Sequence, residues 1–179
     1  MTRFVSRPFV GFSLLYGLTW GVLTIDAPLE RSLLGLALLL PLIWLSQRDL
    51  ELQEIPDLAS LTVALIGMGY WFYVQPQALV LHVASGLIVC AVFWGAGEIF
   101  YRLRAIEGLG IGDAKLLGAL VVVLGPWRLP ELLLLASLGG IGAILLAQRG
   151  RTDTPKGIPF GPFIAYAGFI LLFRNIFFL

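Results

Sequence analysis

The chain of 179 residues is 59% apolar and only 13% charged, whereas soluble domains carry about 25% charged residues. Its polar residues are too few to cover a water-soluble surface, and a net charge of +1 gives no basic surface for nucleic acid. The single cysteine, Cys90, excludes an internal disulfide and a zinc site built from several thiolates. We therefore expect one membrane domain over residues 1–179, surrounded by the lipid bilayer, with Cys90 as a small buried residue.

Seven apolar runs, separated by polar or turn-forming segments, follow one another along the chain. A helix that crosses the hydrocarbon core needs about 20 residues, so these runs predict an all-α, polytopic membrane helix bundle of about seven transmembrane helices. The expected spans are Pro8–Ile25, Ser32–Ser46, Leu58–Val74, Ala78–Tyr101, Asp113–Trp127, Leu129–Gln148 and Pro159–Phe178.

The first run has an alternative interpretation as a signal peptide, because Arg3 and Arg7 precede it. Its apolar stretch is longer than the usual ~7–15 residues, and no clear small-x-small cleavage site follows it. An uncleaved span is the preferred interpretation.

The basic residues divide unevenly between the two sides that seven spans would create. Three of the twelve, Arg31, Arg128 and Arg174, lie on one side. The other nine lie at the N-terminus, in the even-numbered loops or at the adjoining span ends. The positive-inside rule therefore places the N-terminus and the even-numbered loops in the cytoplasm.

The fifth run is too short for an ordinary span. As a helix, the stretch from Asp113 to Gly125 would reach only ~20 Å, against a hydrocarbon core of ~30 Å. Either the helix starts earlier, near Leu109, or it begins inside a water-accessible cleft, which would place Asp113 at membrane depth.

Acidic residues gather in two segments on the same predicted side of the membrane. One segment is the loop from Arg48 to Asp57, and the other is the entry to the fifth span, from Glu107 to Lys115. Two carboxylates that approach closely share a proton, so that one activates water while the other polarises a carbonyl group. On spacing alone, solvated loop charge is the alternative interpretation of both segments.

Three motifs in these and a later segment resemble those of type IV prepilin peptidases, in the same order. The first is Asp49-Leu50 followed by Ile55-Pro56-Asp57. The second is Gly110-Ile111-Gly112-Asp113-Ala114-Lys115-Leu116-Leu117, preceded by Glu107-Gly108, which resembles the family's Gly-x-Gly-Asp-x-Lys-Leu-Leu signature. The third is Ile158-Pro159-Phe160-Gly161-Pro162-Phe163, which resembles its Pro-Phe-Gly-Pro segment.

The resemblance implies an aspartyl endopeptidase without a cofactor or metal ligand, in which Asp49 and Asp113 form the catalytic pair. Asp57 competes with Asp49 for the first role and is otherwise expected to cap the third helix. Lys115 is expected to face another side of its helix from Asp113. The segment from Pro159 to Pro162 would either wall the substrate groove or simply start the last helix. Supporting or substrate-binding roles are implied for Gly110, Gly112, Lys115, Asp57, Glu107, Pro159 and Gly161.

The resemblance also implies the substrate, a prepilin or pseudopilin cut at the cytoplasmic face of the bacterial inner membrane. Glu51, Glu54 and Asp57 would attract a basic leader peptide. Many family members carry a methylation region with zinc-binding Cys-x-x-Cys motifs, and this chain has none. It is therefore expected to be a short form, and N-methylation is in doubt. Archaeal preflagellin peptidases are also short, but the extra first span favours similarity to the bacterial Flp/Tad peptidases. Residues 31–179 would then form the peptidase core and residues 1–30 an additional span.

Two other functions are weighed against this one. A protease of the presenilin type also uses Gly-x-Gly-Asp, but its Pro-Ala-Leu and Tyr-Asp motifs are missing from the sequence. A non-catalytic small transporter or pilus-assembly subunit would use acidic residues to bind cations or protons, and would not need Asp49 close to Asp113.

Two further residues carry expectations of their own. His82, the only histidine, is expected to pack or to hydrogen-bond between helices, because it lacks partners for a metal site. Glu98 is expected to pair with Arg102, four residues later, or to line the active-site cleft.

Overall fold

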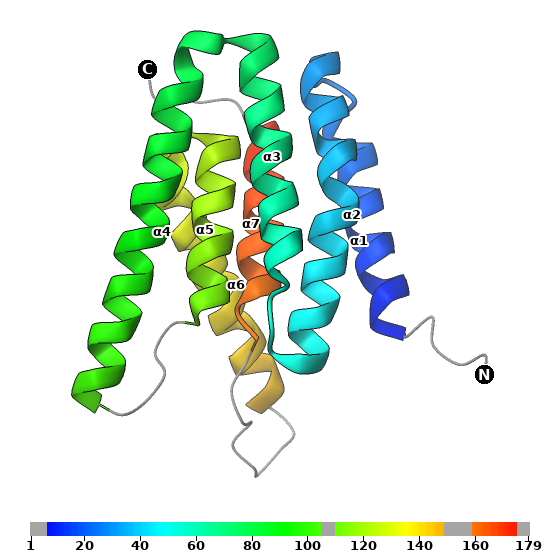
Figure 1. Cartoon of the computed structure of the whole chain (residues 1–179). Helices are drawn as coiled ribbons and strands as arrows, with labels where there is room; N and C mark the ends of the chain where they lie inside the picture. Colours follow the sequence, from blue (N-terminus) through cyan, green and yellow to red (C-terminus); the bar gives the residue numbers. More distant parts are fainter. Residues whose placement is uncertain (1–6, 105–109, 149–158, 175–179) are drawn as a thin grey trace, which may run out of the picture.

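The computed structural model describes residues 7–104, 110–148 and 159–174, and over these residues the chain is helical, without strands (Figure 1). This confirms the predicted all-α bundle. The helices are α1 (Arg7–Leu23), α2 (Leu29–Leu52), α3 (Asp57–Val74), α4 (Pro76–Arg104), α5 (Ile111–Leu124), the short 3-10 helix η1 (Pro126–Arg128), α6 (Leu129–Gln148) and α7 (Gly161–Phe173).

Four helical segments in the described part of the chain are long and apolar enough to cross a membrane: Leu29–Leu52, Asp57–Val74, Pro76–Arg104 and Pro126–Leu146. Large apolar side chains such as Leu87 and Val92 on α4 are exposed on the outside of the bundle. An apolar outer surface of this kind suits lipid rather than water. The chain is a multi-pass membrane protein.

The second span is longer at both ends than the sequence predicts, because α2 runs from Leu29 to Leu52 rather than from Ser32 to Ser46. Counting apolar residues ends a helix at its first polar cluster, but hydrogen bonding of the backbone continues through that cluster. The expected loop from Arg48 to Asp57 therefore shrinks to residues 53–56. Asp49 lies on the last turns of a helix, not in a loop.

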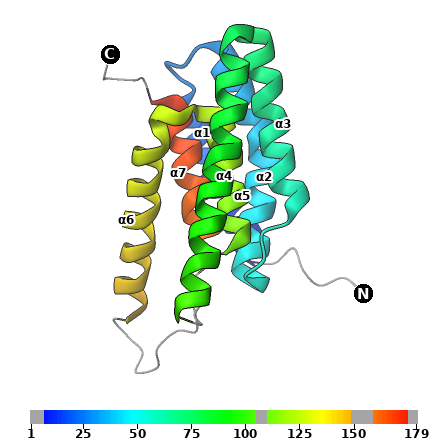
Figure 2. The same ribbon diagram turned by 60° about the vertical axis from the view of Figure 1, so that its left-hand side comes forward.

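The fifth helix is short and central. It begins at Ile111, between the two expected starts near Leu109 and at Asp113, and its 14 residues span about 21 Å. Figure 1 shows that it starts above the lower ends of α4 and α6. It packs among α3, α4 and α7, and its residues 116–123 are all buried. Figure 2 shows α6 at the opposite edge of the bundle from α3.

The remaining spans differ from their predicted bounds by a few residues. The fourth helix runs to Arg104 rather than Tyr101, and the first ends at Leu23 rather than Ile25. The last helix covers Gly161–Phe173 of the expected Pro159–Phe178. Proline at its start and Phe160 as its N-cap agree with helix initiation by this segment.

Successive helices run in opposite directions, so that alternate connections lie at the same end of the bundle. The C-terminal ends of α2, α4 and α6 and the N-terminal ends of α3, α5 and α7 all lie at the lower end in Figure 1. The three motifs therefore meet at one end of the bundle, as predicted. That this end faces the cytoplasm stays a prediction.

The first helix is part of the core. Tyr16 is fully buried and packs edge-on against Tyr166 and Phe169 of α7. Its hydroxyl group is hydrogen-bonded to that of Ser46 on α2 (3.3 Å). That this first span is retained stays a prediction.

Candidate active site

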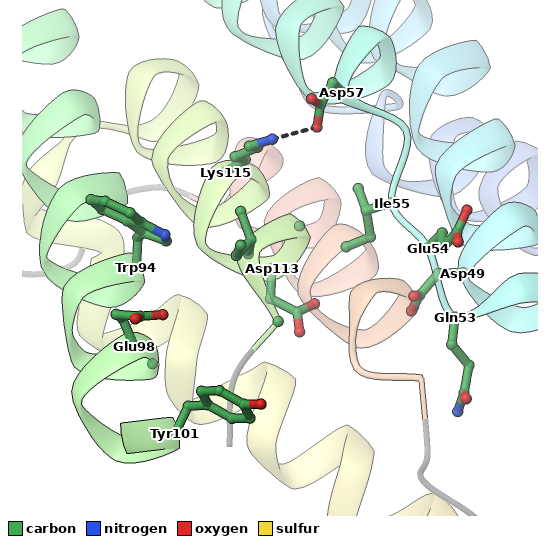
Figure 3. A pocket seen from close by; sticks show the side chains of 14 residues that line it. Asp49, Gln53, Glu54, Ile55, Asp57, Trp94, Glu98, Tyr101, Asp113 and Lys115 are labelled. Atoms are coloured by element: carbon green, nitrogen blue, oxygen red, sulfur yellow. Dashed lines mark hydrogen bonds and ion pairs between the residues drawn. The ribbon is translucent and has the colours of Figure 1, made fainter. Parts of the chain in front are cut away.

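A cavity of about 700 Å³ lies at the end of the bundle where the motifs meet (Figure 3). Its lining comes from the end of α2, the connection to α3, the last turns of α4 and the start of α5. The lining residues are Asp49, Gln53, Glu54, Ile55, Asp57, Trp94, Gly97, Glu98, Tyr101, Gly110, Ile111, Gly112, Asp113 and Lys115.

Asp49 is the buried carboxylate of this cavity, with 5% of its surface exposed. Its Oδ2 atom accepts a hydrogen bond from the backbone N–H of Gly161, at 2.9 Å. Because Gly161 is the first residue of α7, this N–H is one of the donors that a helix leaves without an intrahelical acceptor. The end of α2 and the start of α7 together therefore fix the position of Asp49.

Asp113 reaches the same cavity from the first turn of α5 and is half-buried. Its carboxylate is hydrogen-bonded to the backbone N–H of Gly110, the N-cap of the same helix. A carboxylate at the third helical position that bonds back to the N-cap amide is a common way to start a helix. The glycine also leaves space beside the carboxylate.

The carboxylates of Asp49 and Asp113 point toward one another across the cavity (Figure 3). The charge of Asp49 acts electrostatically on Asp113. Like charges on two carboxylates in such an arrangement disfavour double ionisation of the pair. The structure thus brings together, from helices far apart in sequence, the two residues that the motifs single out.

Asp57 does not cap the third helix as expected. The N-cap is Pro56, without a side-chain hydrogen bond, and Asp57 is the first helical residue. Its carboxylate, still mostly exposed, accepts a 2.7 Å hydrogen bond from the ammonium group of Lys115. A carboxylate in the first turn interacts favourably with the helix dipole even when it is not the N-cap. Lys115 points away from Asp113, as predicted, and its partner is Asp57 (Figure 3).

The remaining predicted residues separate into two groups. Gly112 lines the cavity as Gly110 does, whereas Pro159 and Gly161 lie outside the described lining. Gly161 nevertheless contacts Asp49 through its backbone, and Pro159 is half-buried just before α7. Glu107 falls outside the described residues.

The wall formed by α4 was predicted only in part. Glu98 forms the expected ion pair with Arg102, at 2.7 Å, and it also lines the cavity. Trp94 and Tyr101 line the cavity beside it, and sequence reasoning missed both. Trp94 lies four residues before Glu98 and Tyr101 three residues after it, so all three lie on one face of the helix. This spacing could have indicated from the sequence that the two aromatic residues share the wall with Glu98.

The expectation for His82 is confirmed. The residue is buried, its Nδ1 atom is hydrogen-bonded to the carbonyl oxygen of Val122 on α5 (3.1 Å), and its ring packs against Trp71. Among the described residues, no three His, Cys, Asp or Glu side chains are grouped as metal ligands.

The model of the type IV leader peptidase family matches residues 36–145, more than half of the chain. Three similar proteins are each named prepilin leader peptidase/N-methyltransferase. The protein from Burkholderia pseudomallei strain 1026b is 35% identical over 160 residues, covering 86% of this chain and 50% of the relative. The Escherichia coli K12 protein is 37% identical over 134 residues, covering 72% of this chain and 57% of the relative. The Pseudomonas aeruginosa PAO1 protein is 38% identical over 162 residues, covering 87% of this chain and 47% of the relative.

The chain spans about half the length of the curated relatives that it matches. No solved structure matches the chain significantly. The match over residues 36–145 includes both Asp49 and Asp113. The chain belongs to the type IV leader peptidase family.

Proposed function

We propose that this protein is a membrane-embedded aspartyl endopeptidase that removes leader peptides from prepilins. The observation that carries the proposal is the pair of carboxylates, Asp49 and Asp113, that face one another across one cavity. Membership of the type IV leader peptidase family supports the same function.

The proposed reaction is hydrolysis of a peptide bond without a covalent intermediate. The ionised member of the pair takes a proton from water, and the water oxygen bonds to the scissile carbonyl carbon. The protonated member donates a hydrogen bond to the carbonyl oxygen, where negative charge develops. The C–N bond then breaks as the amine takes up a proton, and the products are the free leader and the mature N-terminus.

The proposed substrate is a Flp-type prepilin or pseudopilin with its apolar helix in the bilayer and a basic leader at the cytoplasmic face of the inner membrane. Acidic side chains in the cavity lining, Glu54 and Glu98 in addition to the pair, support a cationic peptide. Glu51, which was also expected to attract the leader, lies outside the described lining, where its carboxylate accepts a hydrogen bond from Gln47.

Residues 31–179 would form the peptidase core, and residues 1–30 an additional span, whose helix α1 packs against α2 and α7. The relatives' name also includes methyl transfer, whereas the proposal for this chain concerns the cleavage step. The one cysteine of the sequence cannot supply the paired Cys-x-x-Cys motifs of a zinc-binding methylation region.

The test is cleavage of a Flp-type prepilin by the purified protein in detergent or lipid, compared among Asp49→Asn, Asp113→Asn and Asp57→Asn. Asparagine keeps an oxygen that accepts the Gly161 or Gly110 hydrogen bond, so the variants should fold. We expect kcat to fall by about 10²–10⁴-fold for Asp49→Asn and Asp113→Asn, and Asp57→Asn to retain activity.

Two results would change the assignment. An inactive Asp57→Asn beside an active Asp49→Asn would keep the function and overturn the pair. A parent protein that cleaves no prepilin would favour the transporter or assembly-subunit alternative.

A further inference from the structure

Asp49 and Asp113 are held in the cavity in two different ways. Asp113 is hydrogen-bonded to Gly110 at the start of its own helix, which orients its side chain relative to α5. Asp49 is hydrogen-bonded to the N–H of Gly161, which is 112 residues away and begins another helix. The placement of Asp49 relative to Asp113 therefore depends on how α7 lies against α2 and α5.

Gly161 has no room for a side chain. A Cβ atom there would lie 2.7 Å from Oδ2 of Asp49 and 2.9 Å from Cδ1 of Ile55. Both distances are shorter than real Cβ atoms show, so either the carboxylate or the isoleucine would have to move. The absence of a side chain lets the backbone N–H approach the carboxylate directly.

Ile55 also blocks a second glycine of the site. A Cβ atom at Gly112 would lie 2.9 Å from Cβ of Ile55 and 3.3 Å from its Cγ1. The isoleucine comes from the short connection between α2 and α3 and is half-buried. It is thus wedged between the first turns of α5 and α7, and Figure 3 shows it beside both aspartates.

We propose that Gly161 and Ile55 are positioning residues that set the separation and orientation of the two carboxylates. The N–H of Gly161 would hold the Asp49 carboxylate toward Asp113, and Ile55 would keep the starts of α5 and α7 apart. This rests on the proposed peptidase function, and it gives the third motif a role in placing Asp49 rather than in walling the substrate groove.

The first test is Gly161→Ala, assayed for prepilin cleavage with kcat and KM measured separately. A displaced carboxylate changes the geometry of the reacting groups but not the binding of the rest of the substrate. We expect kcat to fall by about 10–100-fold, with KM unchanged within about twofold. The matched control is Gly142→Ala on α6, where an added Cβ meets no atom within 4 Å, and its kcat should equal that of the parent.

The second test is rescue by Ile55→Val, which deletes Cδ1 but keeps Cβ. In the Gly161→Ala background this removes the 2.9 Å contact with Cδ1, and the start of α7 can then shift into the freed space and away from Oδ2 of Asp49, so part of the lost kcat should return. In the Gly112→Ala background the clash is with Cβ itself, so no activity should return. A loss caused by general destabilisation would not distinguish these two backgrounds.

Thermal unfolding midpoints of all variants show whether each one folds. If Gly161→Ala does not accumulate, Ile55→Ala replaces it, because it only removes atoms; kcat should then fall while KM holds. The proposal is overturned if folded Gly161→Ala keeps the parent's kcat, if its loss lies in KM instead, or if Ile55→Val restores Gly112→Ala as fully as Gly161→Ala. If the parent protein cleaves no prepilin, the proposed function is overturned instead. Comparing the variants with the parent therefore separates failure of the proposed function from failure of the positioning role.

Discussion

Replacing Gly118 by alanine is expected to force α4 and α5 apart. A Cβ atom at Gly118 would lie 2.7 Å from the carbonyl oxygen of Gly86 and 2.8 Å from Cβ of Cys90. The first of these atoms belongs to the backbone, so it cannot move without its helix. Ordinary contacts begin at 3.4 Å, so the two helices would have to separate locally by about 0.7 Å, the difference between 3.4 and 2.7 Å.

The expected cost follows from this overlap. Adding a methyl group to a close-packed contact typically destabilises a protein by about 1–3 kcal/mol. Alanine also stabilises a helix by up to ~1 kcal/mol relative to glycine. The control must therefore be another glycine-to-alanine substitution within a helix, which carries the same gain in helix stability. Gly95→Ala on α4 provides it, because an added Cβ there meets no atom within 4 Å.

The assay is thermal unfolding in detergent, followed with a thiol-reactive dye. Cys90 is the only cysteine and lies at this contact, so its labelling reports directly on the opening of α4 from α5. Relative to Gly95→Ala, the midpoint of Gly118→Ala should fall by roughly 2–12 °C. Equal midpoints for the two variants, with equal labelling rates of Cys90, would refute the close approach of the two helices.

Two further predictions concern charges. Glu54→Lys should slow cleavage of a prepilin with a basic leader several-fold more than cleavage of one with a neutral leader, since Glu54 lines the cavity. The control is Glu51→Lys, because Glu51 lies outside the described lining. Equal slowing of both substrates by Glu54→Lys would argue against electrostatic attraction of the leader. Arg128→Gln should lower the free energy of unfolding by roughly 1.5–3 kcal/mol, because the buried Arg128 donates hydrogen bonds to the half-buried Glu131 and to the carbonyl oxygen of Arg174. Arg102→Gln, at the exposed pair with Glu98, should cost only about 0.2–1 kcal/mol, and a similar cost for both variants, measured by unfolding, would contradict the buried role.

The apolar runs predicted the number and order of the helices because length and apolar content are what a bilayer requires of a span. They did not predict where helices end. Polar residues from Gln47 to Glu51 continue α2, since a helix needs only its own backbone hydrogen bonds to extend beyond an apolar stretch. This error placed Asp49 in a loop although it lies on a helix.

The motifs predicted which acidic residues to consider, and they placed Asp49, Asp113 and the Pro-Phe-Gly-Pro segment at one end of the bundle. Local pattern could not show what each side chain contacts. Asp57 looked like a cap because it precedes an apolar run, but Lys115, 58 residues away, is its partner. Trp94 and Tyr101 looked like ordinary aromatic residues of a span until the fold placed them beside Glu98.

The sequence by itself determined that the chain is a bundle of membrane helices, and its motifs indicated the two aspartates. Both depend on local properties, namely apolar length and the identity of residues within short segments. Only the tertiary structure decided that Gly161 donates its N–H to Asp49 and that Ile55 separates α5 from α7. Those contacts join segments far apart in the chain, and they exist only because the packing of the helices brings their ends to one cavity.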